Sequence, residues 1–331
     1  MADSGILDAV IIGCGDIAGG YDEATDRSLI LTHAGAYRQH PGFRVTACVD
    51  PDPMRRRAFM TYWNVSNGFD ELDACLAAGP APDVVSVCSP TSSHAAALER
   101  LLASPVRVVF CEKPMTDDLA TAQRLVQAYE SAGKRLCVNY LRRWDPAMVT
   151  LRTEIESGQW GAVRSVTAFY TKGLCHIGAH MIDLLQFLLG PLSAKTVLRR
   201  HVDHTADDPT TDAVLATSED APVYLVGGDA RDYARFEASI ACQNGVIEII
   251  DSGFRIRRRP VNDHRFFPGR AHLDAGATEE TGLGTALARA VENLYTAATA
   301  AAPLASDGAS ALASESLCDH LANMPVCGAS R

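Results

Sequence analysis

Short apolar runs alternate with amphipathic stretches along the first part of the chain. The runs are rich in valine, isoleucine and cysteine, which is typical of strands that are buried on both faces. We expect strands at 9–12, 44–49, 84–88, 106–111 and 136–139. Helices are expected between them, for example at 92–102 and at 117–131, where Gly133 has the position of a C-terminal cap. This alternation predicts a doubly wound parallel sheet of the Rossmann type, with right-handed crossovers.

The pattern changes after about Arg143. One long helix, at 176–189, precedes consecutive strand-like runs at 195–202, 213–217, 223–226, 235–242, 246–250 and 254–258. Short turns such as Gln243-Asn244-Gly245 join them, which indicates an antiparallel sheet. Two alanine-rich helices, at 283–301 and 309–321, complete a predicted α+β half. We therefore expect two domains, 1–140 and 141–331.

Composition narrows the class of protein. The chain has 331 residues with a formal net charge of −10, which argues against a nucleic-acid partner because phosphates demand a basic surface. It has no apolar run of membrane-spanning length, and Met1-Ala2-Asp3-Ser4 does not begin a signal peptide, so we expect no membrane partner and a cytoplasmic protein. The ten cysteines are scattered without any CxxC pair, and we interpret nearly all as reduced core residues.

A glycine-rich turn follows the first expected strand. Gly13 would allow a tight turn, Gly15 would allow a pyrophosphate to approach, and Ala18 would let the following helix pack on the sheet. The helix N-terminus would attract the phosphate charge. The motif alone is weak and is also compatible with a structural turn, but its place after the first strand favours dinucleotide binding.

Asp50, at the end of the second strand, is the expected partner of the adenosine ribose. Its carboxylate would repel a 2′-phosphate, so NAD is favoured over NADP, although Arg55, Arg56 and Arg57 lie nearby. The chain runs 31 positions from Gly19 to Asp50, against roughly 20 in the plain fingerprint. We place the excess in a polar loop at 20–33 near the cofactor, and either a lid or a surface excursion fits the sequence.

Several further motifs occur in a family-specific order. They are Val49-Asp50-Pro51-Asp52-Pro53, Asp83-Val84-Val85-Ser86-Val87-Cys88-Ser89-Pro90 with His94, Glu112-Lys113-Pro114, Arg142-Arg143-Trp144-Asp145-Pro146 and His176-Ile177-Gly178-Ala179-His180-Met181-Ile182-Asp183. Together with the glycine turn, they resemble the glucose–fructose oxidoreductase / inositol dehydrogenase (Gfo/Idh/MocA) family over nearly the whole chain. The resemblance implies a Rossmann domain, an α+β domain with an open, mostly antiparallel sheet, and an active site between the two.

The resemblance also implies residue roles. Lys113 would be the catalytic or substrate-orienting lysine, His180 the proton-transferring histidine, and the Lys113–Pro114 peptide bond would be cis. Ser89, Pro90, His94, Glu112 and Lys113 would join Gly13, Gly15, Asp16, Ile17 and Asp50 at the cofactor, with His94 near the nicotinamide ribose. The sequence agrees for Lys113, because it follows an apolar strand at the end where doubly wound sheets bind ligands. Without that context, Lys113 would be read as an exposed lysine at a strand end.

His176, His180 and Asp183 fall at i, i+4 and i+7, so we expect them on one helix face. His180 suits a general base, and His176 is a second catalytic candidate. Asp183 either orients the imidazole or has a structural partner, and the sequence supports both equally. The family usually has Asp where this chain has His176, which favours a different sugar, such as a keto sugar or an activated one. A zinc site is disfavoured, because neither a Glu after His176 nor a cysteine pair completes it.

Other polar residues are candidate substrate contacts. Asn139, Tyr140 and Arg143 follow the last Rossmann strand, and Tyr170 and Lys172 end the first strand of the second domain. We expect Trp144 to have a role in domain packing rather than in substrate binding. The remaining histidines show no pattern, and for these we expect surface or packing roles (His33, His40, His201, His204, His264, His272 and His320).

The sequence thus predicts an NAD-dependent oxidoreductase that transfers a hydride between nicotinamide and a sugar, a cyclitol or an activated sugar. The substrate and the direction of transfer stay open. Two alternatives are a lyase or glycosidase that uses NAD transiently, and a non-catalytic NAD-binding sensor. An exposed face of the antiparallel sheet would favour a homodimer or homotetramer.

Overall fold

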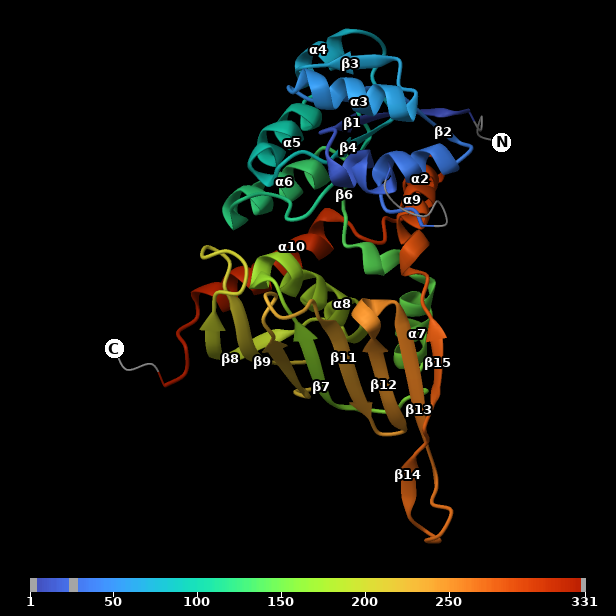
Figure 1. Cartoon of the computed structure of the whole chain (residues 1–331), viewed down its shortest axis with the longest axis vertical. Helices are drawn as coiled ribbons and strands as arrows, with labels where there is room; N and C mark the ends of the chain where they lie inside the picture. Colours follow the sequence, from blue (N-terminus) through green and yellow to red (C-terminus); the bar gives the residue numbers. More distant parts are fainter. Residues whose placement is uncertain (1–4, 24–28, 329–331) are drawn as a thin grey trace. The chain divides into compact units, whose positions relative to one another are not determined.

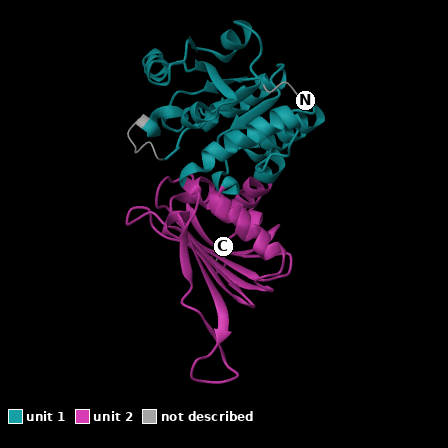
Figure 2. Cartoon of the chain, turned by 90° about the vertical axis from the view of Figure 1, so that its right-hand side faces the viewer, with its two compact units in different colours: residues 1–144, 284–312 teal, residues 145–283, 313–331 magenta. Residues whose placement is uncertain are grey.

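The computed structural model describes residues 5–23 and 29–328 and divides the chain into two compact units (Figures 1 and 2). Unit 1 comprises residues 1–144 and 284–312, and unit 2 comprises residues 145–283 and 313–331. The segment 284–312 falls inside the range 141–331 that the sequence assigns to the second domain, yet it packs with the first. Met1-Ala2-Asp3-Ser4 and residues 24–28 of the expected 20–33 loop lie outside the described residues.

Unit 1 is built on a six-stranded parallel sheet with the order β3-β2-β1-β4-β5-β6. Its strands are β1 (Leu7–Ile12), β2 (Phe43–Val49), β3 (Asn67–Phe69), β4 (Val84–Val87), β5 (Val108–Cys111) and β6 (Arg135–Val138). All residues of β4 and β5 are buried, as expected for valine-rich strands covered on both sides. The strand order reverses between β1 and β4, and this is where doubly wound sheets bind ligands.

The helical elements of unit 1 connect these strands. They are η1 (Asp16–Gly20), α1 (Tyr21–Glu23), α2 (His33–Gln39), α3 (Pro53–Trp63), α4 (Leu72–Ala77), η2 (Thr91–Ser93), α5 (His94–Leu102), α6 (Leu119–Ser131), η3 (Leu141–Trp144), η6 (Leu283–Thr285, which begins one residue before the unit) and α9 (Ala286–Ala300). Asp52 starts α3 by accepting hydrogen bonds from the N–H groups of Met54 and Arg55. Gly133 follows α6 with φ +63°, as its predicted capping position requires.

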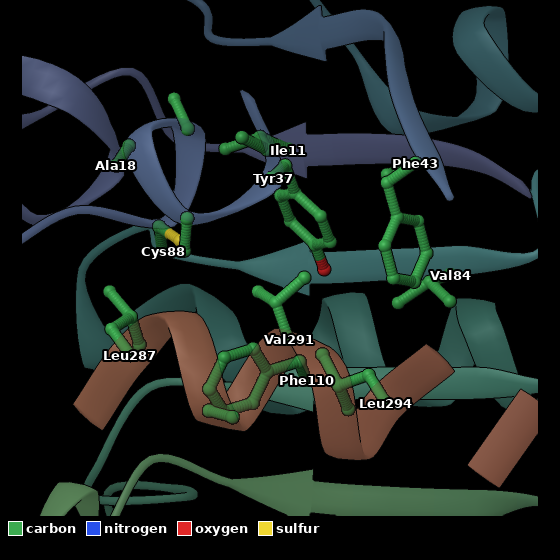
Figure 3. Close-up of a cluster of buried hydrophobic side chains, with 14 of the residues drawn as sticks. Ile11, Ala18, Tyr37, Phe43, Val84, Cys88, Phe110, Leu287, Val291 and Leu294 are labelled. Atoms are coloured by element: carbon green, nitrogen blue, oxygen red, sulfur yellow. The ribbon is translucent and has the colours of Figure 1, made fainter. Parts of the chain in front are cut away.

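Helix α9 contributes to the core of unit 1 although it comes from the far end of the chain. Its buried residues Leu287, Val291 and Leu294 join a cluster with Tyr37 of α2 and Phe110 of β5 (Figure 3). These apolar positions recur at helical spacing, so one stripe of α9 faces the sheet. The Rossmann unit is therefore completed by a C-terminal helix.

Unit 2 contains a nine-stranded sheet with the order β14-β13-β12-β11-β7-β10-β9-β8, and β15 pairs with β13. Its strands are β7 (Val163–Tyr170), β8 (Ser193–His201), β9 (Thr210–Ala216), β10 (Pro222–Gly227), β11 (Phe236–Cys242), β12 (Gly245–Ile250), β13 (Arg255–Asp263), β14 (Ala271–Leu273) and β15 (Ala277–Glu280). The β10–β7 pair is parallel and the other pairs are antiparallel. The predicted fold class, a Rossmann sheet plus a mostly antiparallel α+β unit, is confirmed.

The sheet of unit 2 buries one face. Along β10, Val223 and Leu225 are buried while Tyr224 is 43% exposed, so the strand alternates between a core face and an open face. The remaining helical elements are α7 (Pro146–Glu156), η4 (Gly173–Gly178), α8 (Ala179–Leu189), η5 (Asp251–Gly253) and α10 (Gly308–Asn323, shared between the units). Eight of the eleven residues of α8 are buried, which makes it the central helix of this unit.

Candidate functional site

The two glycines of the N-terminal turn differ in what their surroundings demand. Gly13 has φ +86°, and a Cβ placed on it would lie 2.6 Å from the backbone nitrogen of Ser89, so the fold itself requires glycine there. Gly15 has φ −84°, and a Cβ on it would meet no atom within 4 Å. Nothing in the described protein explains the second glycine, whereas a pyrophosphate lying over the turn would need that open space.

The helix after this turn is shorter than the fingerprint predicts. Asp16 and Ile17 begin η1, which covers only Asp16–Gly20 and has π-helical bonding, and α1 adds three residues. Asp16 is exposed, and Ile17 packs on the core of unit 1. A cofactor phosphate at this turn would therefore depend on the backbone of the loop more than on a long helix dipole.

Asp50 is locked to the glycine turn. The Asp50 residue is 2% exposed. Its Oδ2 accepts a hydrogen bond of 2.8 Å from the N–H of Cys14, and its Oδ1 accepts one of 2.9 Å from the N–H of Asp52. Arg55 lies 3.6 Å from the same carboxylate. These contacts fix the carboxylate at the carboxyl end of β2, where the ribose partner is expected.

A cleft of about 600 Å³ lies at this edge of the parallel sheet. Four predicted cofactor residues line it, namely Gly13, Asp50, Ser89 and Pro90. The rest of the lining comes from β1, β2, α3, α4, η2 and α5 (Ile12, Val49, Pro51, Arg55, Asp70, Glu71, Leu72, Asp73, Ser92, Ser93, Ala96, Ala97 and Arg100). Its position at the topological switch point fits the adenosine half of a dinucleotide.

His94 connects two loops at the carboxyl ends of β4 and β5. Its ring is buried, with Nε2 2.8 Å from the carbonyl oxygen of Ser89 and Nδ1 3.0 Å from that of Pro114. The Lys113–Pro114 bond is cis, as the resemblance implied. Both ring nitrogens of His94 are thus used within the protein, so the residue holds the loops that carry Ser89 and Lys113.

Glu112 is the centre of a buried polar network. His33 Nε2 donates to Glu112 Oε1 at 2.8 Å, and Asn139 Nδ2 donates to the same oxygen at 2.7 Å. Ser86 Oγ lies 3.1 Å from His33 Nδ1 and 2.9 Å from the Tyr37 hydroxyl. Burial alone would raise the pKa of Glu112, but the hydrogen bond and charge of His33, the Asn139 amide and the Lys113 charge outweigh it, and the pKa is lowered.

The network shows what sequence reasoning missed. His33 was expected to have a surface or packing role, yet its side chain has no exposed area and bridges α2 to the residue before Lys113. The carrier helix α2 begins at His33 because Thr32 caps it, and Asp22 accepts hydrogen bonds from Leu31 N–H and the Thr32 hydroxyl. A histidine immediately after a helix cap was the only available signal.

Tyr140, Arg143 and Trp144 follow the last Rossmann strand. Tyr140 is 1% exposed and Arg143 is 9% exposed, and the Arg143 guanidinium donates to the carbonyl oxygen of Ala305 at 3.4 Å. Trp144 is buried and its indole N–H donates to Asn293 of α9 at 3.1 Å. Trp144 therefore packs α9 onto the sheet.

In unit 2, Tyr170 has a structural role. It is fully buried, and its hydroxyl donates to the carbonyl oxygen of Thr211 at 2.9 Å and accepts from the Thr211 N–H at 2.7 Å. The hydroxyl joins β7 to the start of β9 across the sheet. Its interpretation as a substrate contact stays a prediction, and the described contacts of its hydroxyl are structural.

Lys172 lies in strained backbone next to the predicted catalytic helix. Its φ and ψ of 71° and 52° are left-handed, a conformation that costs a non-glycine residue about 1–2 kcal/mol. Asp203 holds it there by accepting from the Lys172 N–H at 2.7 Å, and Gly173 N–H donates to Thr210 at 2.8 Å. Strain of this kind is often kept at binding sites, which supports Lys172 as a candidate contact.

The predicted catalytic helix starts in an unusual way. His176 lies in the π-helical segment η4, whereas His180 lies in the first turn of α8. Asp208 accepts hydrogen bonds from the N–H groups of Cys175 and His176, both at 2.8 Å, and so fixes the π-helical segment η4. The His204 ring lies 5.7 Å from the His176 ring.

Asp183 lies one turn further along the chain. Its side chain is 1% exposed and accepts a hydrogen bond of 3.1 Å from the Ser314 hydroxyl of α10. The contact joins two helices of unit 2. This supports the structural alternative for Asp183.

The described residues show three further general features. Within residues 5–23 and 29–328, no group of three His, Cys, Asp or Glu side chains is placed to hold a metal ion. The ten cysteines all lie among the described residues, none of them forms a disulfide bond, and six are buried. Over the same stretch of chain, none of the helices has the length and apolar character needed to span a bilayer.

Comparisons with known proteins agree with this geometry. Residues 7–140 match the model of an oxidoreductase family with an NAD-binding Rossmann fold. Inositol 2-dehydrogenase of Streptomyces avermitilis is 31% identical over 61% of this chain, which spans 62% of that relative's length. Inositol 2-dehydrogenase of Rhizobium meliloti is 26% identical over 85% of this chain and 90% of its own.

Solved structures share the fold. The WlbA dehydrogenase of Bordetella pertussis, in complex with NADH and UDP-GlcNAcA, superposes with a TM-score of 0.75 at 18% identity and covers 96% of this chain and 95% of its own. The parallel sheet, the glycine turn over open space and the matched family model agree: residues 7–140 carry the NAD-binding Rossmann fold of the Gfo/Idh/MocA oxidoreductases.

Proposed function

We propose that the protein is an NAD-dependent dehydrogenase or reductase that acts on a CH–OH group of a sugar, a cyclitol or an activated sugar. The observation that carries the proposal is the open space above Gly15 beside the fixed carboxylate of Asp50, at the switch point of the sheet. The named relatives, which are inositol dehydrogenases, support a polyhydroxylated substrate. His176, where the family usually has Asp, supports a substrate other than free inositol or glucose.

The charges around the cleft favour NAD over NADP. Four acidic residues line it, Asp50, Asp70, Glu71 and Asp73, against the two arginines Arg55 and Arg100. Arg55 lies against Asp50, and Arg100 forms an ion pair with Asp73. A ribose 2′-phosphate would have to approach a buried carboxylate with both arginines already engaged, which is unfavourable.

The proposed mechanism gives each predicted catalytic residue a role. When bound, nicotinamide supplies the hydride acceptor or donor. Lys113, at the end of β5, would donate a hydrogen bond to the substrate oxygen and stabilise the negative charge that develops on it. His180 would take the hydroxyl proton during oxidation, with His176 as a second polar contact. Glu112, Ser89 and Pro90 would border the cofactor, and Tyr140, Arg143 and Lys172 would border the substrate.

A homodimer or homotetramer is proposed from unit 2. The open face of its sheet carries half-buried and exposed side chains such as Tyr224 and Val226 on β10. A second copy covering that face would bury them. We also propose a cytoplasmic location, which the ten cysteines outside any disulfide bond support because thiols persist in reducing compartments.

The proposal is tested in two steps. Calorimetric titration of the whole chain with NAD⁺ and NADP⁺ should show binding of NAD⁺ at least about tenfold tighter. Sugars, cyclitols and nucleotide sugars are then screened by the change in NADH absorbance. With an active substrate, Lys113→Ala and His180→Ala should each lower kcat by about 10² or more. The exposed Lys195→Ala is the control, and near-normal rates in both active-site variants would refute the mechanism.

A further inference from the structure

Glu112 is a carboxylate with its two oxygens in different situations. Oε1 accepts from both His33 and Asn139, at 2.8 and 2.7 Å. Oε2 takes no part in these two contacts, and the side chain keeps 12% of its area exposed. Because Glu112 directly follows β5, this exposed part lies at the carboxyl edge of the sheet, where the ligand is expected.

The donors around Oε1 hold the carboxylate in its ionised form. An ionised carboxylate can only accept, so His33 must present Nε2–H and Asn139 must turn its amide nitrogen inward. The Ser86 and Tyr37 hydroxyls next to His33 Nδ1 are buried as well, which fixes the imidazole in place. The lowered pKa of Glu112 agrees with this arrangement.

The position of Glu112 relates it to one half of a dinucleotide. In a doubly wound sheet each three-strand half binds one mononucleotide. The half formed by β1, β2 and β3 carries Asp50 and the acidic cleft, whereas the other half, β4, β5 and β6, ends in Ser89, Glu112 and Asn139. The nicotinamide therefore falls to the half in which the Glu112 carboxylate is exposed.

Resting on the proposed function, we propose that the Glu112 carboxylate, held by His33 and Asn139, makes the site prefer the oxidised cofactor over the reduced one. The oxidised nicotinamide ring carries a positive charge and the reduced ring does not. A fixed negative charge at the edge of the ring's site stabilises the cation, and water screens it little because the carboxylate is largely buried. The enzyme would then be poised to oxidise an alcohol rather than to reduce a ketone.

Lys113 carries a charge opposite to that of Glu112, so the direction in which each substitution shifts the cofactor preference can be predicted. Its ammonium group acts on Glu112 electrostatically, so the two charges partly cancel at the ring. Removing the carboxylate leaves a cation next to a cationic ring, and removing the ammonium leaves the carboxylate alone. The two substitutions should therefore shift the cofactor preference in opposite directions.

The experiment measures the dissociation constants of NAD⁺ and NADH for the whole chain by calorimetry. Glu112→Gln keeps the shape and removes the charge, and the ratio Kd(NADH)/Kd(NAD⁺) should fall by at least roughly tenfold, the effect of a unit charge about 12 Å away at an effective dielectric of about 20. Lys113→Met should raise the ratio. Glu292→Gln is the matched control, because Glu292 also pairs with a histidine, His40, at 2.9 Å but is exposed, and there the ratio should not change.

The outcomes separate the inference from the proposed function. If the wild-type chain binds neither cofactor, the proposed function fails. If both cofactors bind and Glu112→Gln leaves the ratio unchanged or raises it, the inference is wrong and the function stands. Should Glu112→Gln not fold, as judged by circular dichroism, Glu112→Ala, which removes the same charge, decides: a lower ratio than that of the wild type supports the inference, and an unchanged or higher one overturns it.

Discussion

Gly13 and Gly15 stand two residues apart in one turn, and alanine should affect them in opposite ways. At Gly13, the new Cβ would lie 2.6–2.7 Å from backbone atoms of Cys88 and Ser89, and φ is +86°. At Gly15, the Cβ would enter open space with φ at −84°. Gly13→Ala is thus a test of folding, and Gly15→Ala is a test of binding.

The magnitudes follow from these surroundings. Left-handed backbone costs alanine about 1–2 kcal/mol, and forcing a methyl group against a neighbouring strand end costs about 1–3 kcal/mol more. Gly13→Ala should therefore lower the free energy of unfolding by roughly 2–5 kcal/mol, which lowers Tm by on the order of 5–15 °C. Gly15→Ala restricts only the unfolded chain, so stability should stay the same or rise by about 0.4–1 kcal/mol.

Binding should change in the reverse order. The methyl group of Gly15→Ala would occupy the space that a pyrophosphate needs, and NAD⁺ affinity should fall by at least about tenfold. Thermal unfolding followed by circular dichroism gives the first quantity, and calorimetric titration of the folded variant gives the second. A Gly15→Ala protein that is stable and binds NAD⁺ as the wild type does would refute the placement of the cofactor over this turn.

Three further substitutions test other parts of the structure. Tyr170→Phe should lower the free energy of unfolding by about 1–3 kcal/mol in denaturant titrations, because the buried N–H and C=O of Thr211 lose their partner; an unchanged value would contradict the structural role. Lys172→Gly should keep or slightly raise stability by removing left-handed strain, and should raise KM if the ammonium contacts substrate; an unchanged KM would remove Lys172 from the site. Glu112 has a lowered pKa in the folded chain, so its contribution to stability is complete above its ordinary pKa and is lost as the pH falls through the lowered value. The stability difference between wild type and Glu112→Gln should accordingly shrink as the pH falls below 4.5, the ordinary pKa, in urea titrations, and a constant difference there would contradict this linkage.

The strands of the parallel sheet were predictable because each is a continuous apolar run between polar segments. The expected runs at 84–88 and 106–111 became β4 (Val84–Val87) and β5 (Val108–Cys111), with small differences at the ends. β3 (Asn67–Phe69) was missed, because a three-residue strand with an exposed asparagine and a glycine carries no such signal. β14 (Ala271–Leu273) was missed for the same reason, since all its residues are exposed.

The placement of α9 could not be predicted. Its alanine-rich stripe shows that one side is buried, but the pattern does not say which sheet it packs on. The structure places that stripe against α2 and β5, so the helix returns to the unit in which the chain began. The packing partner depends on shapes such as the flat rings of Tyr37 and Phe110, which no local pattern encodes.

His33 shows how the same limit affects the candidate site. The motif that contains Glu112 lies 79 positions from His33, and nothing near either residue indicates the other. Only the fold, by starting α2 at His33, brings the imidazole within 2.8 Å of the carboxylate. The chain between the glycine turn and Asp50 therefore includes a helix that carries part of the network. Thr32→Ala, which removes the cap of this helix, tests its influence: the Kd(NADH)/Kd(NAD⁺) ratio should move toward that of Glu112→Gln, whereas an unchanged ratio would mean that the start of α2 has no influence on the network.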